Sequence, residues 1–519
     1  MCNVVVLCND VIMRDSAKKS ILNISLILPL HILQILINFV AKTVFIRSLG
    51  QDYLGINVLF GDITNLLSLT ELGLGSAIMF ALYKPLNTKD TRQISAIINY
   101  AKNLFNKIVI VIIIIGLLII PSLKYVVNSK INMESIIFYY ILYLITVAVT
   151  YFATYKTTLI TADEKTYIVK VYYTITNVIR AVVQMFLLIK TKNFMLYLLM
   201  GILFNLLYNL MITIKVNKDY PFLSSKPRLN KKEKKELFIN TKAVFKHKIA
   251  TLILNSTDNI LISSIISTAV VGKYSGYTTL CTTMIGLMGN FYSGIVHTVG
   301  KLNVNDNANE KHKVFNYVHI FIYLLAGISS VCFILLANDF INLWIGSEYI
   351  LDDKILIAIV LNFYITIISY PVNIYNQTTK LFTKTQNIVI LTAISNIVLS
   401  IFLGKTLGLF GILIATAIAK LITCFWTDPY ILFKKYFECK NKDCILYFLK
   451  VFIEFIFVSL TVLLLSNPLS QIKAETWSAL IIKGIISLIS TSIIFATTTL
   501  VNDDYRKILV KIIRRKKNG

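Results

Sequence analysis

The sequence has few charged residues and lacks the signatures of the common enzyme classes. Only 15% of its 519 residues are charged, against about 25% in soluble proteins. No GxxxxGK[ST] run is present to bind nucleotide phosphates, and no HExxH, GxSxG or Cys/His nucleophile pattern occurs. The seven cysteines form no CxxC pair and no cluster with histidine, so neither a disulfide framework nor a metal site is predicted. These absences argue against an enzyme and against a built-in ATPase.

Apolar residues make up 56% of the chain, and the mean hydropathy is +0.71. They gather in runs of about 20 residues, the length of a helix that crosses the hydrocarbon core of a bilayer. We therefore predict an all-α polytopic membrane protein. About fourteen transmembrane helices are expected, at residues 21–46, 54–83, 104–123, 135–155, 167–189, 194–214, 248–271, 274–299, 314–337, 355–377, 386–404, 408–432, 445–466 and 478–501.

The positive charges are concentrated in alternate loops. Lysine and arginine number 52 against 26 acidic residues, which gives a net charge of +26. With the N-terminus placed in the cytoplasm, 39 of the 52 fall on the cytoplasmic side, nine on the opposite side and four within spans. The positive-inside rule then predicts that both termini are cytoplasmic. The basic loops are expected to lie against membrane lipids, and no nucleic-acid partner is predicted.

The longest loop, which contains KPRLNKKEKKELF, divides the chain into six spans and then eight. A weak echo between GQDYLG at 50–55 and GKYSG at 272–276 favours two pseudo-symmetric six-helix bundles around a central cavity, followed by two further helices. The polar residues after Met13 favour that methionine over Met1 as the start of the protein. The expected parts are a cytoplasmic tail at 1–19, a first bundle at 20–216, a basic linker at 217–247, a second bundle at 248–432, two helices at 433–502 and a basic tail at 503–519.

The apolar stretch Asp52–Pro85 carries carboxylates inside a span, where one charged group costs about 2.5–3.5 kcal/mol on insertion scales. Small or polar residues recur at steps of three and four and therefore share one helix face: Asn57, Gly61, Thr64, Ser68, Glu71 and Gly75. This face either lines a watery cavity or packs closely against another helix through its small residues. Asp62 lies about half a turn away from Glu71, so Glu71 is the stronger candidate for the cavity.

Polar faces also occur on helices of both predicted halves. They contain His31, Gln34, Asn38 and Lys42 in the first helix, Tyr173, Asn177, Arg180 and Gln184 in the fifth, Asn255 and Asp258 in the seventh, Asn362, Thr366 and Asn373 in the tenth, and Thr416, Lys420 and Thr423 in the twelfth. Each alone is explained by an interhelical hydrogen bond or a buried ion pair. Together they predict a polar, hydrated cavity between the halves.

This predicted cavity contains charges of both signs. The cations that are candidates for holding an anionic group such as a phosphate are Arg180, Lys42 and Lys420. The cavity carboxylates are Glu71, Asp258 and Asp62. Two interpretations of the carboxylates stay open, because they either neutralise the cations or bind a coupling proton or sodium ion. No cofactor beyond such an ion is predicted.

Two sequence segments resemble a known family. LGQDYLGINVLF followed by LLSLTELGLGSAIMFALYKPLNTKD, and NSTDNILIS at 255–263, are similar to the bacterial flippases of O-antigen and capsule repeat units. These belong to the multidrug/oligosaccharidyl-lipid/polysaccharide (MOP) exporter superfamily. The resemblance implies two six-helix bundles around a cavity that faces each side of the inner membrane in turn. It also implies an undecaprenyl-diphosphate-linked oligosaccharide as substrate, with polysaccharide polymerase and chain-length proteins as partners. Cations in the family's cavity fit Arg180, Lys42 and Lys420.

Three other functions are compatible with parts of the pattern. An ion-coupled drug exporter of the same superfamily should have a cavity dominated by carboxylates and aromatic residues, whereas this one leans toward cations. A lipid II flippase would use a cationic cavity equally well. A membrane polysaccharide polymerase or ligase should have a large external loop with catalytic residues, whereas here the largest loop is predicted to be cytoplasmic.

Overall fold

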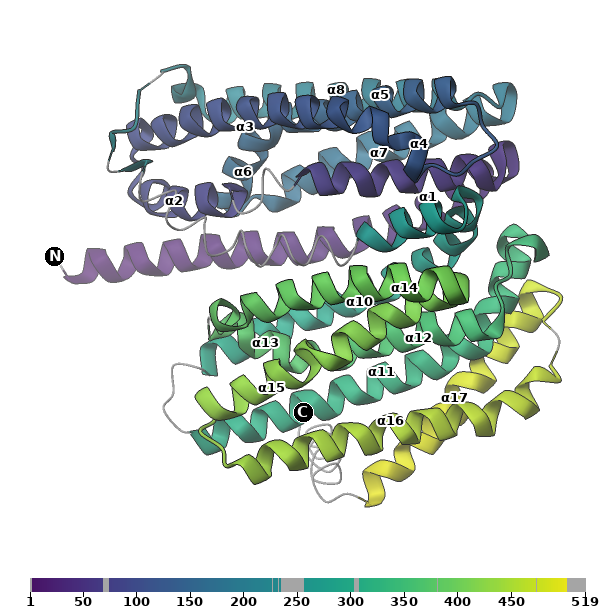
Figure 1. Cartoon of the computed structure of the whole chain (residues 1–519). Helices are drawn as coiled ribbons and strands as arrows, with labels where there is room; N and C mark the ends of the chain where they lie inside the picture. Colours follow the sequence, from purple (N-terminus) through teal and green to yellow (C-terminus); the bar gives the residue numbers. More distant parts are fainter. Residues whose placement is uncertain are drawn as a thin grey trace. The chain divides into compact units, whose positions relative to one another are not determined.

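The computed structural model describes residues 2–68, 74–225, 227–231, 233–234, 256–302, 308–379, 381–472 and 474–501. Side chains are described from Pro29 onward, except at 290–291, 293–294, 297–298, 300–302, 308–310, 382–383, 470 and 498–501. The regular elements assigned within these ranges are helices (Figure 1). Ten of them are long and apolar enough to cross a membrane. The prediction of an all-α multi-pass membrane protein is therefore confirmed. The candidate span Lys384–Lys435 contains two of the predicted segments, which meet near a break at Gly408.

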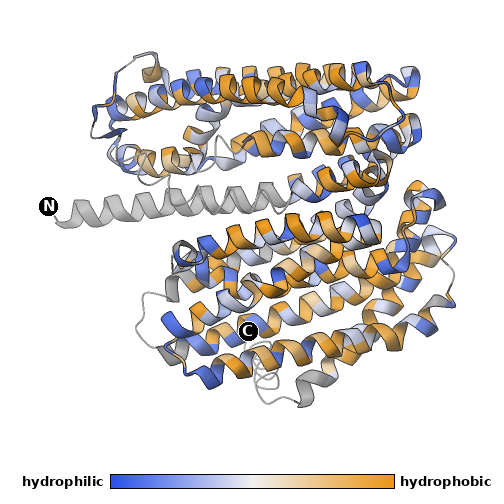
Figure 2. Cartoon of the chain, in the orientation of Figure 1, coloured by the Kyte–Doolittle hydropathy of each residue, from blue (hydrophilic) through white to orange (hydrophobic). Residues whose placement is uncertain are grey.

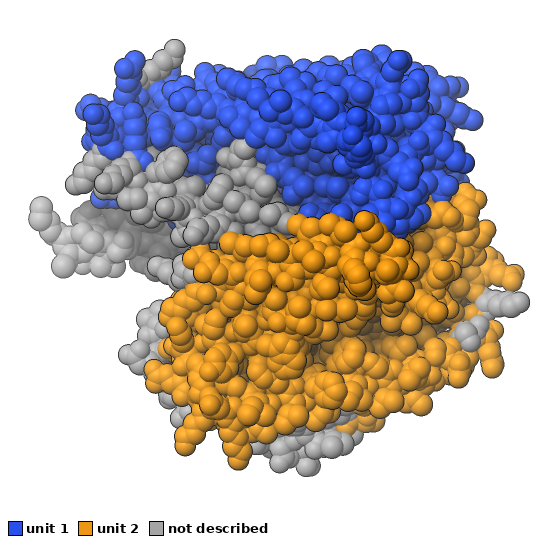
Figure 3. Space-filling view, in the orientation of Figure 1, with its two compact units in different colours: residues 1–272 blue, residues 273–519 orange. Residues whose placement is uncertain are grey.

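The chain divides into two compact units, Met1–Gly272 and Lys273–Gly519 (Figure 3). The helices of the first unit are α1 (Cys2–Leu67), α2 (Leu74–Thr88), α3 (Thr91–Ile119), η2 (Ile120–Ser122), α4 (Leu123–Val126), α5 (Met133–Thr150), η3 (Tyr151–Ala153), α6 (Thr154–Ala162), α7 (Thr166–Thr191), α8 (Phe194–Asp219), η4 (Pro221–Ser224) and a helical segment at 256–265. Within this unit α1 packs chiefly against α7, while α8 packs against α5 and α7.

The second unit is built around α11, which packs against α12, α16 and α17. Its helices are α10 (Thr268–Leu302, whose first residues belong to the first unit), α11 (Ala308–Ile345), η5 (Ser347–Tyr349), α12 (Asp353–Ile368), α13 (Tyr370–Thr378), α14 (Phe382–Ile422), α15 (Cys424–Lys435), α16 (Asn441–Ser470) and α17 (Trp477–Val501). A core of buried aromatic and aliphatic side chains joins α11, α13, α15 and α16, with Phe315, Tyr375 and Phe433 near its centre.

The outward faces of both units carry large apolar side chains. Leu118, Phe402 and Leu463 are each about two-thirds or more exposed, at 73%, 67% and 66%. Figure 2 shows hydrophobic residues along the length of the helices, with hydrophilic residues gathered toward many helix ends. A soluble protein rarely exposes so much contiguous apolar surface. Lipid contact explains the pattern, since acyl chains solvate these side chains in the membrane.

Glycines decide two local features of the first unit. The element α1 consists of two helices joined at Gly50, whose φ of 81° lies in the left-handed region that glycine adopts without strain. This break falls between the first two predicted spans. Gly55 and Gly272 instead allow close backbone approach, because an added Cβ would lie 1.9 Å from the Thr268 carbonyl oxygen and 2.2 Å from the Gln51 carbonyl oxygen, respectively. The residues after the break in α1 therefore pack directly against the start of α10.

A small polar cluster outside the spans fixes the end of α6 against the end of α8. Tyr220 donates a hydrogen bond of 2.7 Å from its hydroxyl to Asp163 Oδ2, and Lys165 Nζ lies 2.6 Å from the same oxygen. Burial, followed by the nearby Asp163 carboxylate, raises the pKa of Tyr220. The phenol therefore stays protonated and keeps donating to Asp163 at neutral pH.

Candidate substrate-binding site

Eight of the ten predicted site residues lie in the described part of the chain. Glu71 and Asn255 lie outside it. Six of the eight belong to the first unit: Asn38, Lys42, Asp62, Asn177, Arg180 and Asp258. Asn373 and Lys420 belong to the second unit.

Asp62 is held by a residue far away in the sequence. Asn259 Nδ2 donates a hydrogen bond of 2.7 Å to Asp62 Oδ2, and Asp258 lies beside Asn259 on the helical segment 256–265, partly buried. Ser263, on the same segment, donates a hydrogen bond of 2.7 Å to the carbonyl oxygen of Val126. The segment that was predicted to open the second half thus brings its polar residues to α1 within the first unit.

Arg180 lies on α7 with incomplete hydrogen bonding. Its terminal nitrogen donates to Asn177 Oδ1, one turn earlier on the same helix. Its Nε is buried and has no hydrogen-bond partner among the residues described. None of the ion pairs within 4.0 Å in the described ranges involves this guanidinium. The guanidinium therefore retains donor capacity that a carboxylate or phosphate group would satisfy.

Tyr143 of α5 lies near both Asp62 and Arg180. Its hydroxyl lies within electrostatic reach of both Asp62 and Arg180, and a Cβ at Gly61 would lie 3.5 Å from its oxygen. Asp62, Tyr143 and Arg180 therefore occupy one region of the first unit. The sequence pattern identified the two charged residues but missed the tyrosine, since aromatic residues are common in spans.

The remaining candidates of the first unit lie on the first half of α1. Asn38 is exposed and accepts a hydrogen bond of 3.0 Å from Gln34 Nε2, one turn earlier. Lys42 is partly buried one turn later, on the predicted face.

In the second unit, polar residues of α12 and α14 contact each other. Lys420 Nζ lies 3.3 Å from Thr366 Oγ1, and Asn362 Nδ2 donates a hydrogen bond of 2.7 Å to the Leu413 carbonyl oxygen. Thr416 accepts a hydrogen bond of 2.7 Å from Asn396 on the preceding part of α14. Much of this predicted face is thus used for hydrogen bonds between helices.

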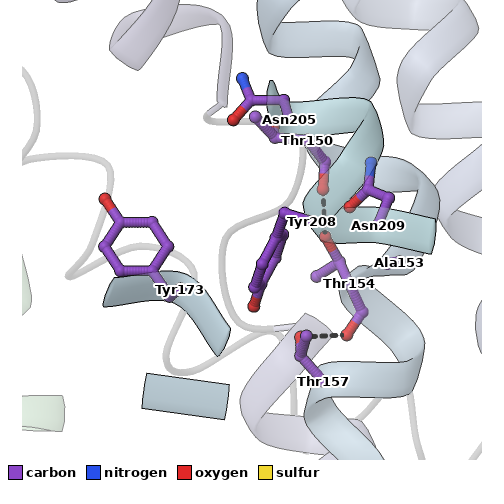
Figure 4. A pocket seen from close by; sticks show the side chains of 8 residues that line it. All are labelled: Thr150, Ala153, Thr154, Thr157, Tyr173, Asn205, Tyr208 and Asn209. Carbon is purple, nitrogen blue, oxygen red and sulfur yellow. Dashed lines mark hydrogen bonds between the residues drawn. The ribbon is translucent and has the colours of Figure 1, made fainter. Parts of the chain in front are cut away.

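A cavity of about 250 Å³ lies within the first unit, between the end of α5, η3, α6, α7 and α8 (Figure 4). Its lining contains hydroxyl and amide groups and no charged side chain: Thr150, Ala153, Thr154, Thr157, Tyr173, Asn205, Tyr208 and Asn209. Tyr173 belongs to the same predicted polar face of α7 as Asn177 and Arg180. Asn205 and Asn209 were not predicted, although two asparagines four residues apart in an apolar helix are a detectable signal.

Comparison with solved structures identifies the fold. One structure, described as lipid II flippase MurJ in an inward closed conformation, matches over 92% of this chain and 100% of its own, with 17% identity and a TM-score of 0.67. The chain has the fold of MurJ. An inward-facing multidrug resistance MATE family transporter of the MOP superfamily matches over 75% of this chain and 91% of its own, at 13% identity and a TM-score of 0.61.

A mutant of the Vibrio cholerae MATE transporter VcmN shares the fold over 82% of this chain and 98% of its own, at 13% identity and a TM-score of 0.55. The similarity lies in the fold and not in the sequence. No protein-family model matches the chain. No curated protein sequence matches it either. The fold common to MurJ and the MATE transporters is therefore the finding that these comparisons supply.

Proposed function

We propose that this chain is a flippase for undecaprenyl-diphosphate-linked oligosaccharide repeat units. It moves them by alternating access from the cytoplasmic to the outer leaflet of the bacterial inner membrane, for O-antigen or capsule biosynthesis. Fourteen spans, two pseudo-symmetric six-helix bundles around a central cavity, two further helices and cytoplasmic termini are part of the proposal. The fold supports it, since a lipid II flippase matches over nearly the whole chain.

The observation that carries the proposal is the incomplete hydrogen bonding of Arg180. An arginine within a span is costly unless its hydrogen bonds are satisfied, and such residues mark functional sites. Arg180 has a neutral partner, Asn177, and a buried Nε without one among the described residues. A diphosphate is the anion that suits this guanidinium, because its oxygens accept two parallel hydrogen bonds from the planar fork.

The other charged candidates have supporting roles in this proposal. Lys42 and Lys420 add positive charge for the diphosphate as the protein changes conformation. Asp62, Asp258 and Glu71 either balance these cations or bind a coupling H+ or Na+. No covalent step is required, because transport needs only different affinities for the substrate in two conformations. Polymerase and chain-length proteins are the partners expected to use the delivered repeat units.

A lipid II flippase is the second candidate. The match to MurJ favours it directly, and the argument from Arg180 applies equally to any diphosphate-linked lipid. The match to MATE transporters makes a drug exporter the third candidate. An arginine with unused hydrogen-bond donors does not suit a cationic drug, however.

The test is transport by the purified chain in liposomes loaded with one of three probes: undecaprenyl-diphosphate-linked oligosaccharide, lipid II or a cationic dye. We expect the wild type to move the oligosaccharide lipid. Arg180→Ala should slow this by about tenfold or more, the loss of about 1.4 kcal/mol or more of charge-assisted hydrogen bonding. Arg180→Lys should retain part of the rate. Lys190→Ala is the matched control, since Lys190 is an exposed cation on the same helix.

The alternatives give different results in the same assay. Movement of lipid II without the oligosaccharide lipid would select the second candidate, and dye transport alone would select the exporter. Normal transport of the oligosaccharide lipid by Arg180→Ala would remove the assigned role of the arginine.

A further inference from the structure

One wall of the cavity in Figure 4, formed by threonines of α5 and α6, presents hydrogen-bond acceptors. The hydroxyls of Thr150, Thr154 and Thr157 each donate to a carbonyl oxygen three or four residues earlier, at 2.7, 3.1 and 2.9 Å. Their hydrogens are thereby used, and the oxygen lone pairs remain free to accept. A ligand that donates several hydrogen bonds would complete this wall.

Beside these threonines, α8 contributes two asparagines to the lining, and one of them has an unused hydrogen-bond acceptor. Asn209 is 7% exposed, and its Nδ2 donates a hydrogen bond of 2.6 Å to the Val149 carbonyl oxygen. Its Oδ1 is buried and has no partner in the described part of the chain. A buried amide oxygen without a partner is costly, which points to a donor supplied by water or a ligand.

The size and the aromatic rings of the cavity limit which ligands can bind there. About 250 Å³ is below the ~300–1,000 Å³ of sites for drug-sized ligands. It holds one small ring and not a whole oligosaccharide. The rings of Tyr173 and Tyr208 meet edge to face with centroids 6.0 Å apart. They offer both apolar faces and hydroxyls, and no charged side chain lines the cavity to bind an ion.

The cavity is also placed at a suitable distance from Arg180. Tyr173 and Arg180 are seven residues apart on α7 and therefore share a face, about 10 Å apart along the helix axis. The positive-inside rule puts the Tyr173 end of α7 toward the cytoplasm, where the substrate would enter. A diphosphate at Arg180 would leave an attached sugar within reach of Tyr173.

We propose that this cavity is the subsite for a sugar ring next to the diphosphate of the transported lipid. The inference rests on the proposed function. The sugar hydroxyls donate to the threonine oxygens and to Asn209 Oδ1, Asn205 bonds a further hydroxyl, and the tyrosine rings cover the apolar face of the sugar. The chain thus recognises the sugar nearest the lipid through uncharged groups, separately from the diphosphate.

The test compares two lipids in liposomes that contain the full chain: undecaprenyl-diphosphate-linked oligosaccharide and undecaprenyl diphosphate without sugar. The variant is Asn205→Leu, chosen because this side chain has no hydrogen-bond partner within the described ranges, so that its loss leaves no such partner unsatisfied. Asn217→Leu is the matched control, since Asn217 is exposed on the same helix outside the cavity. A second variant, Tyr173→Leu, changes the ring at the other side of the cavity. Thermal unfolding of each variant checks that it is folded.

We expect Asn205→Leu and Tyr173→Leu to raise the half-saturating concentration of the oligosaccharide lipid by about five- to tenfold. The concentration for the sugar-free lipid should stay unchanged, as should both values for Asn217→Leu. Equal effects on the two lipids, or no effect on either, would overturn the sugar subsite while leaving the flippase intact. If the wild type moves no oligosaccharide lipid, that result refutes the proposed function, and the sugar subsite that rests on it is refuted too.

Discussion

Removing either member of the buried pair His319 and Glu454 should strongly destabilise the second unit. His319 Nε2 on α11 lies 2.9 Å from Glu454 Oε2 on α16, and the side chains are only 1% and 6% exposed. The rings of Phe315 and Tyr447 pack against the imidazole, so little water can reach it. Breaking a buried pair by removing one partner costs about 3–5 kcal/mol, because the other polar group stays buried and loses that partner.

The size of the effect on the midpoint of thermal unfolding follows from the size of the unit. For 150–250 residues, about 1 kcal/mol shifts Tm by about 2–4 °C, and the unit runs from Lys273 to Gly519. Glu454→Met and His319→Phe should therefore each lower Tm by about 6–20 °C. The double variant replaces both polar groups with apolar ones of similar volume, and it should return to within about 1 kcal/mol of the wild type.

Thermal unfolding in detergent, followed by circular dichroism, measures these shifts. The control is Lys215→Met, which breaks the partly exposed pair Lys215–Asp219 at the end of α8 and should change stability by at most about 1 kcal/mol. Single variants that shift Tm by no more than this control would refute the reasoning. So would a double variant as unstable as the worse of the two singles, because the penalty would then not come from a buried polar group that has lost its partner across the pair.

Two further predictions concern other contacts. Gly272→Ala should lower Tm by several degrees, because the new methyl group would meet the Gln51 carbonyl oxygen at 2.2 Å. The control Gly201→Ala, whose new methyl group would have its nearest atom at 3.9 Å, should leave Tm unchanged or slightly raised. Equal Tm values for the two variants would contradict the close approach at Gly272. In the pair Lys483–Asp339 the side chains are 6% and 31% exposed, respectively. Asp339→Leu should lower the free energy of unfolding by about 3 kcal/mol and Lys483→Met by about 1 kcal/mol, because water can reach the aspartate but not the lysine when its partner is removed. The reverse order in unfolding experiments would show that exposure does not decide the cost.

The membrane class and many helix positions are predictable from local sequence. Apolar runs at 167–189 and 194–214 predict spans, and α7 and α8 occur there with nearly the same limits. The signal is local because every backbone group inside a bilayer must be satisfied within its own helix. Limits in the polar parts are less predictable. The third predicted span begins at 104, whereas α3 begins at Thr91, where Asp90 caps the helix by accepting from the Gln93 amide.

The candidate site is only partly predictable, since periodicity shows which residues share a face but not what that face meets. The polar faces predicted on the tenth and twelfth helices have the same spacing as the face on α7. In the structure, Asn362 bonds the backbone of α14 at Leu413, whereas Asn177 bonds Arg180 on its own helix. A cavity-lining face and a packing face therefore look alike in the sequence, because both avoid lipid.

Lys483 and Arg180 show what the tertiary structure adds. Each is a lone cation in an apolar run, and the sequence gives no reason to separate them. Lys483 meets Asp339, 144 positions away, at 2.7 Å, so its charge is balanced within the protein. Arg180 meets no carboxylate among the described residues and keeps a buried, unpartnered Nε. A cation paired with a distant carboxylate stabilises the fold, whereas a cation left with a neutral partner is available to an anionic ligand. The distinction depends on contacts between distant positions, which is why the substrate hypothesis rests on Arg180 and not on the number of intramembrane charges.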